Sequence, residues 1–264
     1  MLIDSHCHLD VAEFDSDRAA VIAAARRRGV AGILVPGFDR ASWQRIADLA
    51  DAYPDIHPAY GLHPGFIDQH EDADVDALAG WIAQRRCVAV GECGLDFYVP
   101  GFDLQRQLDV LRPQLALARA LDLPLILHGR RAFDRLLAEV RRVGKLRGIV
   151  HSFAGSPEQA RQWCNEGFLL GFGGPVTYDR AARLRKVVAA LPLDHLVLET
   201  DAPDQPLQGR QGQRNEPALV VDVLDCVARL RGASAEHIAE ATTRNLVRLL
   251  RVPLPSAALV DRDR

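Results

Sequence analysis

The chain has 264 residues, of which 48% are hydrophobic and 25% charged, and its formal net charge is −3. This composition is typical of a globular protein, and the length allows one large core or two modest ones. The near-neutral charge excludes a global basic field, so any contact with a polyanion depends on local arginines. No apolar run reaches the 18 residues of a membrane span, so we expect no membrane contact.

The five cysteines are odd in number and contain no C-x-x-C pair. This pattern favours reduced thiols over a disulfide framework, and we expect a cytoplasmic protein. The first apolar residues already belong to a predicted strand, which leaves no room for a signal peptide. No segment of the sequence indicates an obligate protein partner.

Short apolar runs alternate with longer helical patterns along the chain. The first half gives four strand–helix units. A strand opening at Ile3 precedes a helix over 10–28. Strands over 30–35, 56–61 and 87–91 precede helices over 41–52, 75–85 and 104–121, respectively. The second half gives four more: 125–127 with a helix ending at Val143, 148–150 with a helix opening at Ser156, 168–171 with 181–190, and 196–198 with helices over 217–231 and 234–250.

Eight such units predict an α/β fold, a parallel (β/α)8 TIM barrel, which typically needs about 250 residues. We expect a single catalytic barrel domain over 1–252 and a polar, disordered C-terminal tail over 253–264. A doubly wound open sheet is the competing fold, but no G-x-G-x-x-G motif follows the first predicted strand.

Polar residues follow the predicted strands at the ends where the active sites of such barrels lie. His6 and His8 come first, and their spacing places both side chains on one face of an extended segment. The equivalent positions on later strands hold His63, Glu92, His128, His151 and Asp201. Four of the histidines and two carboxylates form a set that predicts a metal site: His6, His8, Glu92, His128, His151 and Asp201.

Mixed imidazole and carboxylate ligands suit zinc or a similar divalent ion. Six ligands are too many for one four-coordinate zinc, which indicates two ions. Two ions about 3.5–4 Å apart need a bridging anion. The only lysines, Lys145 and Lys186, lie away from strand ends, so a carbamylated lysine cannot bridge. Glu92 is the natural bridge, and Asp201 is then free to bind one metal and hold the nucleophilic water.

The chain resembles the TatD-like metal-dependent hydrolases of the amidohydrolase superfamily. The matching motifs run in order over nearly the whole chain: DSHCHL at 4–9, GLHP at 61–64, GECGLDF at 91–97, LHGR at 127–130, VHSFAG at 150–155, GGPVTY at 173–178, LETDAP at 198–203 and RNEP at 214–217.

The resemblance implies two divalent ions per subunit, zinc or manganese/magnesium. It implies one ion on His6, His8, Glu92 and Asp201, and a second on Glu92, His128 and His151. It also implies a deoxyribonuclease of the 3'-5' exonuclease type, in which Asp201 and Glu92 serve the chemistry. Single-stranded or damaged DNA, or a small phosphodiester, would be the substrate.

Other residues near the predicted site receive secondary roles. His63, Arg130 and Arg214 are candidate substrate-binding residues, since arginine can hold a phosphate with two hydrogen bonds. Asp96 could orient a ligand or close the turn after its strand, whereas Cys7 and Cys93 are expected to be buried packing residues.

The chain departs from the family pattern at Gly129, at Ser152 and in the loop 203–207. These positions lie where substrate would bind, so the sequence does not decide which type of bond is hydrolysed. The same site could hydrolyse an amide, a lactone or an aminoacyl ester, since a metal ion activates carbonyl and phosphoryl groups alike. A barrel that only binds metal or a partner is a third hypothesis, against which the intact ligand set argues.

Overall fold

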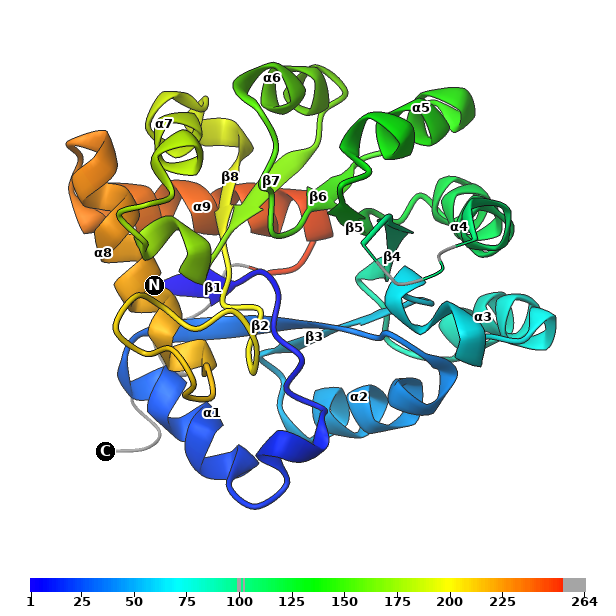
Figure 1. Ribbon diagram of the computed structural model, residues 1–264. Coiled ribbons are helices and arrows are strands. Elements are labelled where there is room, and N and C mark those ends of the chain that lie inside the picture. Colours follow the sequence, from blue (N-terminus) through cyan, green and yellow to red (C-terminus); the bar gives the residue numbers. More distant parts are fainter. Residues whose placement is uncertain (99–100, 102, 254–264) are drawn as a thin grey trace.

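The computed structural model describes residues 1–98, 101 and 103–253 of the chain. Eight strands form one parallel sheet in which each strand pairs with the next along the sequence (Figure 1). The strands are β1 (Leu2–Asp4), β2 (Val30–Pro36), β3 (Ile56–Tyr60), β4 (Ala89–Asp96), β5 (Leu125–Arg130), β6 (Gly148–Val150), β7 (Leu169–Phe172) and β8 (Leu196–Leu198).

Backbone hydrogen bonds join the last strand to the first and bring the sheet close to a full ring. Ser5 N donates to Leu198 O at 2.9 Å, Asp201 N donates to His6 O at 2.8 Å, and His8 N donates to Ala202 O at 2.8 Å. The predicted (β/α)8 barrel is therefore confirmed, and the doubly wound sheet is excluded.

Most helices surround the strands on the outside of the ring, and α9 lies across one end of it (Figure 1). They are α1 (Arg18–Arg27), α2 (Arg40–Ala52), α3 (Asp72–Gln84), α4 (Leu104–Ala120), α5 (Phe133–Val143), α6 (Pro157–Asn165), α7 (Ala182–Ala190), α8 (Val220–Arg231) and α9 (Ala235–Leu250). Short 3-10 turns add η1 (Ala12–Phe14), η2 (Pro64–Gln69), η3 (Gly174–Thr177), η4 (Leu193–His195) and η5 (Pro217–Leu219). Within the described residues, no helix combines the length and apolarity needed to cross a membrane.

Local sequence signals set most helix boundaries. Asp39 caps α2 by accepting a hydrogen bond from Ser42 N at 2.7 Å. Ser156 caps α6, and Pro157 occupies its first turn, where a missing N–H costs nothing. Gly232 ends α8 in the left-handed conformation that glycine adopts without strain.

Several predicted boundaries are wrong. The strand predicted over 125–127 continues to Arg130, and the helix predicted over 75–85 begins at Asp72. Two other differences have a clear physical reason. The helix predicted over 10–28 is divided into η1 and α1, because the Arg18 guanidinium bonds to Leu9 O and Val11 O and holds that segment as a turn. The strand predicted over 87–91 continues to Asp96, because its ladder with β5 extends to the pair Asp96 and Arg130.

The interior of the ring is packed at one end. Each strand contributes one buried apolar residue to this layer: Ile3, Leu34, Ala59, Ala89, Ile126, Ile149, Leu169 and Val197. Leu246, Leu249 and Leu250 of α9 belong to the same cluster, so α9 closes the ring at this end. The polar residues that follow the strands therefore lie above a closed apolar floor. The predicted tail over 253–264 lies outside the described residues except for Pro253.

Candidate metal centre

His6 and His8 extend from the end of β1 toward the centre of the ring. The segment that carries them is held extended on both sides, since Cys7 N donates to Leu34 O and Cys7 pairs with Ala202 in a parallel bridge. Cys7 is fully buried on the other face, and Cys93 is buried as well, both as free thiols. The alternation of an extended chain thus separates the two imidazoles from the packing cysteine.

Four ligand atoms converge around the first group. His6 Nε2 lies 3.2 Å from His8 Nε2 and 3.1 Å from Glu92 Oε2. His8 Nε2 lies 3.4 Å from Glu92 Oε2, and Asp201 Oδ1 lies 3.5 and 3.7 Å from the Nε2 atoms of His6 and His8. Ligand atoms around a tetrahedral ion, about 2.1 Å from the metal, lie about 3.4 Å apart. The spacing therefore fits one divalent ion.

A second group surrounds the other oxygen of Glu92. Glu92 Oε1 lies 2.8 Å from His151 Nε2 and 3.1 Å from His128 Nδ1, and these two nitrogens lie 3.2 Å apart. Glu92 thus presents one carboxylate oxygen to each group. This is the arrangement that a bridging carboxylate requires.

The electrostatics of Glu92 agree with this position. Burial disfavours its charge, but His151, His63 and His6 outweigh burial and hold the pKa of Glu92 well below its usual range. The carboxylate is therefore ionised at the centre of the cluster. Burial lowers the pKa of His6 well below its usual range, so that imidazole is neutral, the form that binds metal.

The buried atoms of the cluster also fit a bound cation. Glu92 Oε2 is buried without a hydrogen-bond partner among the described residues. Glu92 Oε2 lies close to two imidazole nitrogens, yet neither contact has hydrogen-bond geometry. Glu92 Oε2 and the Nε2 atoms of His6 and His8 lie 3.1 to 3.4 Å from one another, as ligands of one ion do. The donor set of imidazoles and carboxylates suits zinc or a similar metal.

His63 joins the cluster as a hydrogen-bond donor. Its Nδ1 accepts a hydrogen bond from Gly65 N at 2.8 Å, which assigns the ring hydrogen to Nε2. That Nε2 lies 3.2 Å from Glu92 Oε1. Burial lowers the pKa of His63 to about 4, so the ring is neutral and has one hydrogen to donate. This geometry makes His63 a hydrogen-bond donor toward Glu92, and its contact with substrate stays a prediction.

Asp96 combines the two roles expected as alternatives. Its Oδ2 lies 3.0 Å from His128 Nε2, which leaves the Nδ1 lone pair directed at Glu92. Its Oδ1 accepts a hydrogen bond from Tyr98 N at 2.8 Å and closes the turn after β4. Burial favours the neutral form of Asp96, but the hydrogen bonds from His128 and Tyr98 N, together with nearby positive charge, outweigh burial and lower its pKa.

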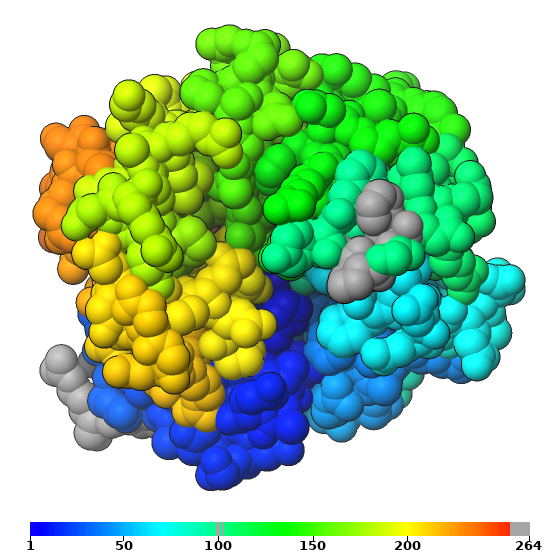
Figure 2. Space-filling view, in the orientation of Figure 1, coloured from blue at the N-terminus to red at the C-terminus, as the bar shows by residue number. Residues whose placement is uncertain are grey.

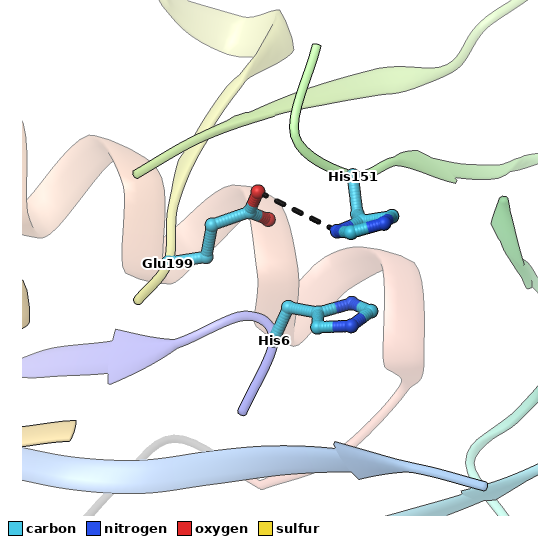
Figure 3. Close-up of side chains that lie close together, drawn as sticks. All are labelled: His6, His151 and Glu199. Carbon is cyan, nitrogen blue, oxygen red and sulfur yellow. Dashed lines mark ion pairs between the residues drawn. The ribbon is translucent and has the colours of Figure 1, made fainter. Parts of the chain in front are cut away.

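Glu199 is a buried neighbour of the cluster that sequence reasoning passed over. Its Oε1 lies 3.8 Å from His151 Nδ1, and the His151 ring stacks on His6 with centroids 3.9 Å apart (Figure 3). Burial raises the pKa of Glu199 to about 7. Gly171 provides its space, since a Cβ there would lie 2.1 Å from Glu199 Oε2. The sequence signal that could have identified Glu199 is its position two residues before Asp201, a spacing that places both side chains on one face of an extended segment.

Gln205 is a second residue that sequence reasoning did not identify. Its Nε2 donates to Asp201 Oδ2 at 2.5 Å and lies 2.8 Å from Ser152 Oγ. This contact leaves Asp201 Oδ1 to face His6 and His8. Asn215 Nδ2 holds the loop by donating to the carbonyl oxygens of Asp204 and Gln205. Gln205 and Ser152 both lie in segments that depart from the family pattern.

The cluster lies at the base of a cavity of about 1680 Å³ that opens on the face shown in Figure 2. His63 and Arg130 line this cavity. Arg214 does not, because its guanidinium bonds to both carboxylate oxygens of Asp17 at 2.9 and 2.6 Å and to Glu216 at 3.0 Å. The structure thus brings together every predicted site residue except Arg214, which it places beside α1.

Comparison with known proteins gives consistent matches over the whole barrel. The sequence profile of a family described as TatD related DNase matches residues 3–251. The metal-dependent hydrolase YjjV of Escherichia coli is 41% identical over 254 residues, covering 95% of this chain and 98% of that protein. The 3'-5' ssDNA/RNA exonuclease TatD of Erwinia tasmaniensis is 33% identical over 256 residues, covering 94% and 99%. The crystal structure of Escherichia coli YjjV is similar with a TM-score of 0.92 at 40% identity, covering 96% and 98%.

Proposed function

The chain belongs to the TatD-related DNase family of metal-dependent hydrolases, and on this premise we propose that it is a phosphodiesterase acting on single-stranded DNA. The proposal includes two divalent ions bridged by Glu92, and hydrolysis of the 3'-5' exonuclease type. One relative, the Erwinia exonuclease, carries a name with this activity.

The observation that carries the proposal is the position of Glu92 between two groups of imidazoles. Its Oε2 faces His6 and His8 at 3.1 and 3.4 Å, and its Oε1 faces His128 and His151 at 3.1 and 2.8 Å. Paired ions are typical of phosphatases and nucleases, because two charges can stabilise both the attacking and the leaving oxygen. The arginines that line the cavity supply the positive charge that a phosphodiester needs.

Each side chain of the cluster then has a defined task. His6, His8, Glu92 and Asp201 would hold one ion, and Glu92, His128 and His151 the other. When bound, the two ions would polarise the phosphoryl group and lower the pKa of a coordinated water.

Asp201 would accept a proton from the attacking water, and this role is supported by Gln205, which bonds its Oδ2 and leaves Oδ1 directed into the cluster. Burial raises the pKa of Asp201, which favours proton uptake. The His63 Nε2–H would donate to a phosphate oxygen. Arg130 would contact a phosphate from the cavity wall.

The proposal is tested by assaying the metal-loaded protein on a labelled single-stranded oligonucleotide and on a panel of esters, lactones and amides. We expect the oligonucleotide to be shortened and the Asp201→Asn variant to lose about 100-fold or more in kcat, since a general base contributes about that much. Hydrolysis of a lactone or an amide, with no cleavage of the oligonucleotide, would overturn the proposal in favour of carbonyl chemistry.

A further inference from the structure

Two arginines and a tyrosine form an exposed group at the rim of the cavity, which we name the arginine–tyrosine platform: Tyr98, Arg130 and Arg131. The guanidinium carbons of Arg130 and Arg131 lie 3.8 and 4.6 Å from the centre of the Tyr98 ring. All three residues line the cavity, and the ring is half exposed. Among the described residues, neither guanidinium lies within ion-pair distance of a carboxylate, and the charge of Arg130 contributes to the lowered pKa of Asp96.

The platform is held in a defined position relative to the candidate metal centre. Asp96 bonds His128 through one carboxylate oxygen and the backbone N of Tyr98 through the other. The ladder between β4 and β5 pairs Asp96 with Arg130, and Phe97 N donates to Arg130 O at 2.9 Å. Arg130 also follows His128 by two residues in β5, which corresponds to about 7 Å along the strand. One carboxylate therefore orients both the His128 ring and the platform.

The charge of the cavity wall differs between its two sides. The side above β4 and β5 carries Arg130, Arg131 and Arg135 beside one exposed carboxylate, Asp134, whereas the side above β8 and β1 carries the exposed carboxylates of Asp204 and Glu13. In a ring of eight strands in sequence order, these two sides face each other. A polyanion that reaches the cluster is thus attracted toward the platform and repelled from the other side.

We propose that the arginine–tyrosine platform binds a backbone phosphate adjacent to the scissile one in a single-stranded nucleic acid. The inference rests on the proposed phosphodiesterase function and adds a second anion subsite to it. Arg131 is the distinctive member, because it would contact a phosphate that the reaction itself does not involve. The Tyr98 ring keeps the two guanidinium groups close together while their remaining N–H donors stay available.

The test compares a decanucleotide with a dinucleotide, because the dinucleotide contains only the scissile phosphate. The ratio of kcat/KM for the two substrates measures what the additional phosphates contribute. We expect Arg131→Gln to lower this ratio about 5- to 10-fold, mainly through KM, as the loss of one exposed charge-assisted contact would. The slope of log KM against log salt should decrease by roughly 0.7 for the decanucleotide. Arg131→Lys should retain most of that salt dependence.

Two further variants sharpen the result. Asp204→Asn should raise the ratio, because it removes repulsion from the opposite wall. Arg180→Gln is the matched control, since Arg180 is an exposed arginine 5.1 Å from the Tyr178 ring and does not line the cavity. An unchanged ratio in Arg131→Gln, or an equal loss on both substrates, would overturn the subsite alone. Failure of the wild type to cleave either substrate would instead overturn the proposed function, and the subsite with it.

Discussion

At the scale of single residues, Asp96 connects the candidate metal centre to the rest of the barrel. It bonds His128 and the turn at Tyr98, and its own backbone is held by the buried Gln107. Residues that orient a ligand in this way typically change metal affinity about 10–100-fold when they are replaced. We predict a loss of this size for Asp96→Asn, measured by competition with a zinc chelator. Asp72→Asn, which changes an exposed aspartate paired with Arg106, should leave affinity unchanged.

The residues of the candidate metal centre could be predicted from the sequence, because histidines and carboxylates that follow the strands of a barrel gather at one end of it. The same reasoning passed over Glu199 and Gln205. Glu199 lies beside the cluster, in a space that exists because Gly171 has no side chain. Gln205 is an ordinary loop residue until the fold brings its amide to Asp201. Arg214 was predicted to bind substrate because it follows β8, but the fold places its guanidinium against Asp17.

At the scale of elements, an ion-pair group joins α4 to α5. Glu139 is buried in α5, and its carboxylate accepts two hydrogen bonds from Arg112 of α4, at 3.0 and 3.1 Å. Arg135 and Arg142 contact the same carboxylate at 2.8 and 3.1 Å. The hydrogen bonds from Arg112 dominate and lower the pKa of Glu139.

A carboxyl group whose pKa is lowered by folding stabilises the folded state above its unfolded pKa of about 4.3, and this stabilisation is lost as the pH falls through its folded pKa. We predict that Glu139→Gln costs about 1 kcal/mol at neutral pH, after allowing for the partly exposed arginines, or about 2 °C in Tm. The difference from wild type should stay constant down to about pH 5 and shrink below about pH 4. Thermal melts at several pH values measure it, with the exposed Glu158→Gln as control. A difference that grows on acidification would contradict this account.

The bounds of helices and strands could be predicted where residues close together in the sequence set them. Short apolar runs gave β6 and β8 with their observed bounds, and caps such as Ser156 gave the helix starts. Boundaries failed where side-chain contacts or pairing between strands decide them. The turn before α1 depends on Arg18 reaching back to Leu9 and Val11, and the end of β4 depends on its ladder with β5.

At the scale of the whole molecule, the alternation of strands and helices was enough to predict the barrel, because parallel strands joined through helices form only a few folds. The apolar floor contributed by all eight strands then forces the polar residues to the opposite end. The unequal charge of the cavity walls could not be predicted, since it arises from residues that are far apart in sequence, Arg131 on one side and Asp204 on the other.

The central claim is that Glu92 joins two metal ions in one centre, and metal stoichiometry tests it most directly. Wild-type protein and Glu92→Ala are dialysed to equilibrium against zinc, and the metal bound per chain is measured by elemental analysis. Circular dichroism checks that the variant remains folded. The account predicts two ions per chain in the wild type and fewer than one in Glu92→Ala, because each group loses the Glu92 oxygen that is directed at it. A wild type that binds only one ion, or a folded Glu92→Ala that still binds two, would contradict it.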